Sequence, residues 1–181
     1  LKIEGGSPGA DKVLTSDADG DATWEAAAGG GSWNLITSST FPAAVTWTLT
    51  GIDTTYDLYH WSLSGVNINN DNNSVFLRVG DSSGIKTDAH YTYNISKNGA
   101  VGATHDSEVG TDQTSAKIFN DQGNAGSESG SANLWVHRTG RGVNINGTLT
   151  YQKATPVLHT GYCGIWYDVT SFDITQVQLF S

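Results

Sequence analysis

Short runs in which apolar and polar residues alternate recur along most of this chain, separated by turn-forming residues. The clearest is TYDLYHWSLSGV, where Tyr59, Trp61 and Leu63 occupy alternate positions and so share one face of an extended strand. About ten such runs are found, at residues 32–38, 44–52, 55–66, 72–80, 89–96, 115–121, 131–138, 143–152, 161–169 and 172–180. No helical pattern separates them, and parallel strands would need such crossovers. The pattern therefore predicts an all-β fold, an antiparallel β-sandwich resembling a jelly roll.

Two glycine- and serine-rich stretches interrupt this pattern. GGG at residues 29–31 is predicted as a flexible joint between a short N-terminal stalk or hairpin segment, residues 1–31, and a head domain, residues 32–181. DQGNAGSESGSA, residues 121–132, is predicted as a low-complexity loop within the head. The chain is thereby expected to consist of one small polar segment and one β-sandwich domain.

Charge and composition limit the classes of partner. Only 15% of the residues are charged, and the formal net charge is −9. Nucleic acid is an unfavourable partner for such a chain, because phosphate contacts need lysine and arginine. No apolar run approaches the ~20 residues that span a bilayer, so membrane insertion is not expected. The single cysteine, Cys163, excludes an internal disulfide and lies in mostly apolar sequence, which predicts a buried thiol.

The stretch KVLTSDADGDATW, residues 12–24, permits two interpretations. Asp17, Asp19 and Asp21 alternate like the first ligands of an EF-hand calcium loop, but Ala28 stands where the bidentate glutamate belongs. Alternatively, VLT and ATW are short strands, and the Asp-Gly pair between them is a strong signal for a two-residue hairpin turn. We favour the hairpin and predict neither a bound metal ion nor a cofactor.

Period-two alternation also assigns faces to the strands near the end of the chain. The residues expected to point inward are Leu134, Val136, Cys163, Ile165, Tyr167 and Val169. Those expected to point outward are Trp135, His137, Tyr162 and Trp166. Bulky outward rings call for cover or for a ligand. We favour a subunit interface, since Trp and Tyr are enriched in interface cores; the alternative is a stacking platform for sugar rings.

No catalytic constellation stands out from the sequence. GDSSG, residues 80–84, matches the pattern of a nucleophile elbow, but a β-like segment rather than a helix follows Ser82. The five histidines are far apart and have no zinc-binding spacing. Acidic residues are plentiful, yet no pair is singled out for glycoside hydrolysis, and Glu128 lies in loop-like sequence. We therefore expect that the protein is not an enzyme.

The segment HRTGRG, residues 137–142, carries the strongest candidates for ligand binding. Arg138 and Arg141, two of the few arginines, flank a Thr-Gly turn, and His137 stands beside them. Guanidinium groups at a loop tip suit a carboxylate or phosphate on a glycan, although a solvated hairpin tip without a ligand is the simpler interpretation. Tyr91 and Tyr93 are weaker candidates, as residues on which a sugar ring stacks.

Several of these segments together resemble a known family. GGSPGADKVLTSDADGDATWEAAAGGGSW, residues 5–33, looks like the stalk-to-head junction of tailed-bacteriophage tail fibres. The segments SWNLI, TWTLTGIDTTYDLYHWSLSGV and VFLRVGDSSGIKTDAHYTY, with the later INGTLTY and FDITQVQLF, are similar in order to their distal domains. The resemblance covers most of the chain. It implies an extracellular adhesin of the virion, usually a homotrimer, that recognises the host cell surface; receptor loops vary in this family, so it implies no particular binding residue.

The expected function is thus attachment of a homotrimeric tail fibre to a host cell-surface receptor, with a polysaccharide as the expected ligand. A short segment with few apolar residues does not fold alone, whereas three copies could bury Ile3, Val13, Leu14 and Trp24 around an axis. Repetition would also strengthen weak glycan contacts. Three other functions stay open: a carbohydrate-binding module of a bacterial enzyme or adhesin, a depolymerase or esterase, and a structural trimerisation tip that binds no receptor.

Overall fold

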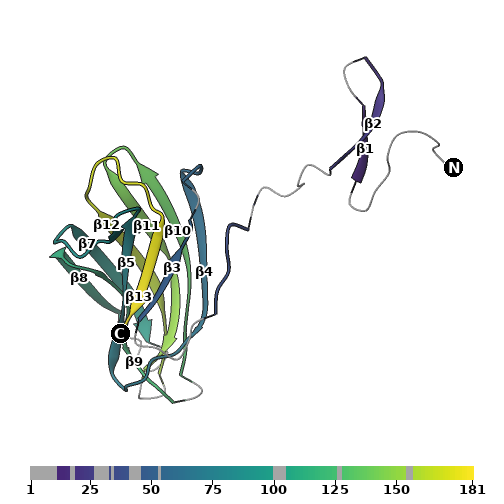
Figure 1. The fold of residues 1–181 in the computed structure, drawn as a ribbon. Coiled ribbons are helices and arrows are strands. Elements are labelled where there is room, and N and C mark those ends of the chain that lie inside the picture. Colours follow the sequence, from purple (N-terminus) through teal and green to yellow (C-terminus); the bar gives the residue numbers. More distant parts are fainter. Residues whose placement is uncertain are drawn as a thin grey trace. The chain divides into compact units, whose positions relative to one another are not determined.

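The structure, a computed structural model, describes residues 12–16, 19–26, 33, 35–40, 46–52, 54–99, 105–125, 128–153 and 157–181. The chain divides into two compact units, Leu1–Ile36 and Thr37–Ser181. The joint predicted at residues 29–31, Ile3 and Asp17 all lie outside the described residues. All named elements are strands, which confirms the all-β prediction (Figure 1). Within the described part, no helix is long and apolar enough to cross a bilayer.

The first unit contains one antiparallel hairpin, formed by β1 (Lys12–Ser16) and β2 (Ala22–Ala26). The hairpin interpretation of the acidic stretch is confirmed, but the tight turn is not. Ser16 pairs with Ala22, so residues 17–21 connect the strands in place of a two-residue turn. Within this connection Gly20 adopts a φ of 89°, a left-handed conformation that its missing Cβ permits.

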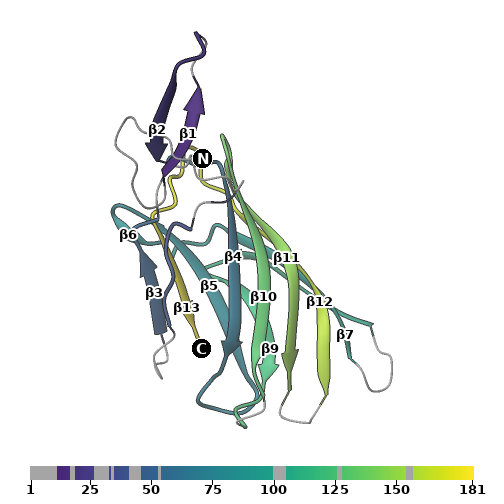
Figure 2. The same ribbon diagram turned by 90° about the vertical axis from the view of Figure 1, so that its right-hand side faces the viewer.

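The second unit is a sandwich of two antiparallel sheets (Figure 1). The larger sheet has six strands in the order β4 (Leu58–Val66), β10 (Gly130–Thr139), β11 (Gly142–Gln152), β12 (Leu158–Tyr167), β7 (Tyr91–Gly99) and β8 (His105–Gln113). The smaller sheet has the order β3 (Thr46–Thr50), β13 (Gln176–Phe180), β5 (Asn73–Asp81) and β6 (Gly84–Ile85), and β9 (Ala116–Gln122) pairs with β5. Figure 2 shows the long strands of the larger sheet side by side from β4 to β7.

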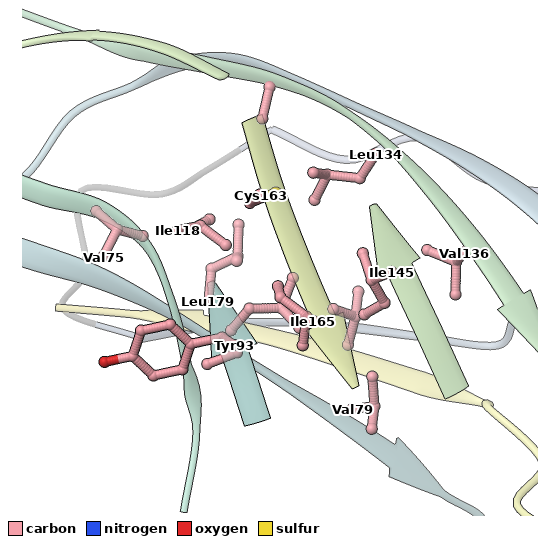
Figure 3. Packing of buried hydrophobic residues seen from close by; sticks show 14 of the residues in the cluster. Val75, Val79, Tyr93, Ile118, Leu134, Val136, Ile145, Cys163, Ile165 and Leu179 are labelled. Carbon is pink, nitrogen blue, oxygen red and sulfur yellow. The ribbon is translucent and has the colours of Figure 1, made fainter. Parts of the chain in front are cut away.

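Alternate side chains of the two sheets meet between the layers and form the core (Figure 3). Leu77 on β5 and Leu179 on β13 pack in one cluster with Leu134, Ile145 and Ile165 of the larger sheet. Burying each such side chain contributes about 1.5–3 kcal/mol. The inward set predicted for the strands near the end of the chain is confirmed: all lie in this cluster except Val169, which is half-buried and packs against it.

Strand β8 was absent from the pattern-based prediction, and its composition explains why. Its sequence HDSEVGTDQ has a single large apolar residue, Val109, which is exposed. The strand forms because β7 pairs along its length and because two of its carboxylates meet lysines. Lys97 on β7 is only 1% exposed, and its Nζ lies 3.1 Å from Oδ2 of Asp106. Lys117 of β9 likewise pairs with Glu108.

Two predictions about loops and strands need correction. Residues 33 and 35–38, within a predicted strand, are exposed and have no strand conformation. The predicted loop at 121–132 is shorter than expected, since β9 continues to Gln122 and β10 begins at Gly130. Within it Glu128 is 6% exposed, and its carboxylate accepts a hydrogen bond of 2.8 Å from the Ala125 amide. Glu128 therefore shapes the loop from inside.

Candidate functional site

The two tyrosines predicted to stack on sugars lie in the core of the sandwich. Tyr91 is fully buried, and its hydroxyl accepts a hydrogen bond of 3.0 Å from the Val79 amide. Tyr93 is 8% exposed. Burial raises the pKa of both phenols above the usual tyrosine value. Both rings lie with Ile95 on the inner face of β7, so the prediction that they stack on a sugar is wrong.

Arg138, the first predicted binding residue, is bound within the protein. Its Nη2 lies 2.6 Å from Oδ1 of Asp173, and its Nη1 donates hydrogen bonds to the Thr54 and Tyr56 carbonyls. The Arg138 amide also donates to the Asp57 carbonyl at 2.8 Å. The guanidinium therefore fastens the chain before β4 to the end of β10, a structural task that occupies most of its donors.

His137 and Arg141, which precede and follow Arg138 in the sequence, are both exposed. Arg141 is at the tip of the β10–β11 turn, where its amide donates to Oγ1 of Thr139 at 3.3 Å. An open pocket of about 460 Å³ next to the turn is lined by Asp57, His137, Arg138, Thr139, Gly140, Ser171, Phe172 and Asp173. Two carboxylates face one guanidinium there, so this pocket is poorly suited to the anionic glycan group that the arginines were predicted to hold.

A different set of residues comes together on the outer face of the larger sheet. His60 of β4 lies opposite Trp135 of β10, and Trp135 lies opposite Asn146 of β11. The same row continues to Gly164 of β12 and Asn94 of β7. The two adjacent rows bring further aromatic and amide groups to this face. We call the whole set the platform: His60, Asn94, Asn133, Trp135, His137, Asn144, Asn146, Thr148, Tyr162, Gly164 and Trp166.

Aromatic rings on the platform are exposed to different degrees. Tyr162 is 69% exposed and Trp135 is 38% exposed, while Trp166 is half-buried. The outward orientation predicted for Trp135, His137 and Tyr162 is thus confirmed, and Trp166 occupies an outward register position on the same strand as Tyr162. These aromatic rings lie on strands β10 and β12, about 10 Å apart at ordinary strand spacing.

Gly164 leaves the centre of the platform without a side chain. It stands on β12 between the outward residues Tyr162 and Trp166, and a Cβ added to it would meet no atom within 4 Å. Beside it, an open depression of about 370 Å³ lies between Trp135 and Tyr162. The depression is lined by Asn133, Trp135, Asn146, Gly147, Thr148, Tyr162 and Cys163. Aromatic rings and amide groups therefore lie side by side around this shallow depression.

The platform carries no fully charged side chain. On β4, β10, β11, β12 and β7, all of which the structure describes, the outward positions hold no Asp, Glu, Lys or Arg. They are mostly Asn, Ser and Thr, with the aromatic residues between them. The acidic residues of a chain with net charge −9 thus lie elsewhere.

The outer face of the smaller sheet shows the opposite arrangement. Phe76 and Phe180 stack there with centroids 5.4 Å apart. Arg78 lies 4.2 Å above the Phe180 ring, and Lys117 lies 5.9 Å from the Phe76 ring. Cation–π contacts of this kind cover aromatic faces. The aromatic rings of the smaller sheet are therefore covered from within the protein, whereas Tyr162 and Trp135 present surface to the outside.

The motifs weighed for catalysis have structural explanations. In GDSSG, β5 and β6 form a hairpin around Ser82, without the helix that a nucleophile elbow requires. The Asp81 carboxylate organises this turn, accepting bonds of 2.8 Å from the Ser83 amide and 2.6 Å from the Ser83 hydroxyl, and it pairs with Lys86. Among the described residues, no group of three or more His, Cys, Asp or Glu side chains is placed to hold a metal ion.

Comparison with protein-family models, with curated proteins and with solved structures found no match for this chain.

Part of this site could be predicted from the sequence. Sequence reasoning turned Trp135, Tyr162 and Trp166 outward but missed the amides and Gly164. One signal was available: in VNINGTLT, residues 143–150, the positions that alternate with Val143, Ile145 and Leu149 are Asn, Asn, Thr and Thr. An outward face so rich in amides and hydroxyls, next to strands with outward rings, favours a ligand with many hydroxyl groups.

Proposed function

We propose that this chain is the distal part of a bacteriophage tail fibre, and that its sandwich head binds a polysaccharide of the host cell surface. The observation that supports the proposal most is the platform, where exposed Trp135 and Tyr162 alternate with the amides of Asn133 and Asn146. Sugar rings have apolar C–H faces and hydroxyl edges. Aromatic rings suit the former, and amides, which donate and accept, suit the latter.

The composition of the platform favours a glycan over a second head as its occupant. Stable interfaces between identical subunits have contiguous apolar cores. Here Trp135, Tyr162 and Trp166 are separated from one another by Asn, Thr or Gly along the registered rows and strands, so these three rings form no continuous apolar patch. We therefore assign these rings to ligand binding rather than to the subunit interface that the sequence alone favoured.

Assembly into a homotrimer is assigned to the N-terminal unit instead. In the hairpin, Val13 and Leu14 are 42% and 40% exposed, and Leu14 pairs with Trp24. A two-stranded hairpin is at best marginally stable by itself. Association of three copies would cover these side chains and give each fibre three heads, which raises the avidity of weak glycan contacts.

Binding without cleavage is part of the proposal. Glycoside hydrolysis requires two carboxyl groups at the scissile bond, and the platform has none. A purified surface polysaccharide incubated with the full chain should therefore keep its reducing-end and acetyl content. Release of either would support the depolymerase or esterase alternative.

The proposal is tested by adsorption of the labelled full chain to cells from a panel of bacterial species, measured by flow cytometry. We expect adsorption to at least one strain, its loss after periodate oxidation of the cells, and its survival after protease treatment. Trp135→Ala combined with Tyr162→Ala should abolish adsorption. Leu158→Ala, which removes an exposed apolar side chain of β12 outside the platform, should not.

The alternatives give other results in the same experiments. Folded protein that adsorbs to no strain would contradict the proposal and favour a structural trimerisation tip. A carbohydrate-binding module would bind glycan through the same platform but have the mass of a monomer in light scattering.

A further inference from the structure

We infer that the glycan bound by the platform is uncharged, and that one of its sugar residues sits over Gly164, between Tyr162 and Trp166. This inference depends on the proposed function and adds the chemical class of the ligand and the position of its seat.

The charges on the outer face of the larger sheet favour an uncharged ligand. An acidic polysaccharide carries a carboxylate or phosphate in its repeat, and proteins hold such groups with Arg or Lys. The outward positions of β4, β10, β11, β12 and β7 contain neither, and the guanidinium of Arg138 is paired with Asp173. The net charge of −9 also repels polyanions at long range. Amides and hydroxyls, by contrast, can both donate hydrogen bonds to the hydroxyl groups of neutral sugars and accept hydrogen bonds from them.

The residues around Gly164 favour this position for a bound sugar residue. Gly164 is in register with Asn146 on one side and Asn94 on the other, so amide side chains flank the bare position across the strands. Along β12 it is flanked by Tyr162 and Trp166, whose Cα atoms are about 13 Å apart at the usual rise of a strand. Aromatic rings along the strand and amides across the strands thus surround a position that has no side chain. Glycine in a strand interior often marks a place where a ligand approaches the backbone.

Gly164→Thr separates this role from a structural one. A Cβ at this position meets no atom within 4 Å, and Gly164 has no positive φ. Threonine also favours a strand more than glycine does, by roughly 0.5–1 kcal/mol. The variant should therefore be at least as stable as the parent while its side chain occupies the seat. We expect at least a tenfold loss of affinity with no fall in the urea midpoint. The matched control is Thr160→Leu, which enlarges an outward residue of the same strand outside the platform and should bind normally.

The charge of the ligand is tested with polysaccharide extracted from a strain that adsorbs the protein and divided on an anion-exchange column. The neutral fraction should compete with the cells for the full chain, and the acidic fraction should not. Binding of the neutral fraction, followed by the intrinsic tryptophan fluorescence of the chain, should be unchanged between low and high salt. Salt would weaken binding that depended on charge.

Competition by the acidic fraction, or normal binding by Gly164→Thr, would overturn this inference while leaving glycan attachment in place. Competition by neither fraction, with cells still adsorbing the protein, would overturn both this inference and the polysaccharide receptor of the proposed function. Adsorption to no strain at all would instead contradict the proposed function.

Discussion

The imidazole of His60 lies against the indole of Trp135, with ring centroids 4.8 Å apart and 40° between the planes. The two residues face each other on neighbouring strands β4 and β10. The imidazole therefore restricts how the indole can turn, and a ring held in place loses less entropy when a ligand binds.

Removal of either member of this pair should weaken glycan binding, to different extents. Trp135→Ala deletes a stacking surface and should cost at least tenfold in affinity, as expected for a central aromatic contact. His60→Ala leaves the indole but removes its support, so a loss of a few-fold is expected. Titration calorimetry with the competing polysaccharide measures both. Equal affinities for the parent and Trp135→Ala would contradict the assignment of the platform.

The Asp81 turn should make the head sensitive to acid. Burial opposes the charge of this carboxylate, but the hydrogen bonds from Lys86 and Ser83 prevail and lower its pKa from 3.8 to about 2. Because the folded pKa lies below the unfolded one, the stabilisation is complete above about pH 4 and is lost as the pH falls through 2. Its size is about 1–2 kcal/mol. Asp81→Asn should lower the free energy of unfolding at neutral pH and flatten its decline in acid, as urea titrations at several pH values would show.

His159 should contribute a second pH dependence, nearer to neutrality. Its ring stacks on Tyr151 with centroids 5.4 Å apart and 18° between the planes. Burial, followed by the charges of Lys153 and Lys97, lowers its pKa below 6.5. The unfolded chain therefore binds the proton more readily, so this contribution is complete above about pH 6.5 and declines as the pH falls. His159→Phe keeps the stacked ring and should remove that decline; a slope identical to that of the parent would exclude His159 as its source.

Two glycines of β12 should respond oppositely to the same substitution. A Cβ on Gly161 would lie 2.1 Å from the Ser96 carbonyl oxygen, which is backbone and cannot move without disturbing the β12–β7 ladder. A Cβ on Gly164 would meet nothing. Gly161→Ala should therefore cost several kcal/mol, of order 2–4, as strained core substitutions do, whereas Gly164→Ala should be neutral or slightly stabilising. Thermal unfolding of the two variants makes the comparison, and equal melting temperatures would contradict it.

The full chain should have the mass of a trimer in size-exclusion chromatography with light scattering. Leu14→Glu places a charge on a side chain that we expect at the trimer axis and should yield monomers. Thr23→Ser, on the other strand of the hairpin, serves as the control and should remain trimeric. A parent chain with the mass of a monomer would refute the assembly, and so would a Leu14→Glu variant that is still a trimer.

Some of this protein could be determined from the sequence alone, because strand formation and side-chain direction are local properties. Alternation in NLWVHR and GYCGIWYDV was enough to bury Leu134 and Ile165 and to turn Trp135 and Tyr162 outward. An edge strand without apolar alternation, such as β8, has no local signal, and it exists because β7 supplies its hydrogen-bond partners.

Only the tertiary structure determined which residues of different strands lie next to each other. Tyr91 and Tyr93 were expected to stack on a sugar, but the packing of the larger sheet against the smaller one places both in the core. The role proposed for Gly164 depends on Asn146 and Asn94. Strand pairing brings these three residues, which are far apart in the chain, into one row. Strand register depends on pairing over long sequence distances, and no stretch of local sequence contains that information.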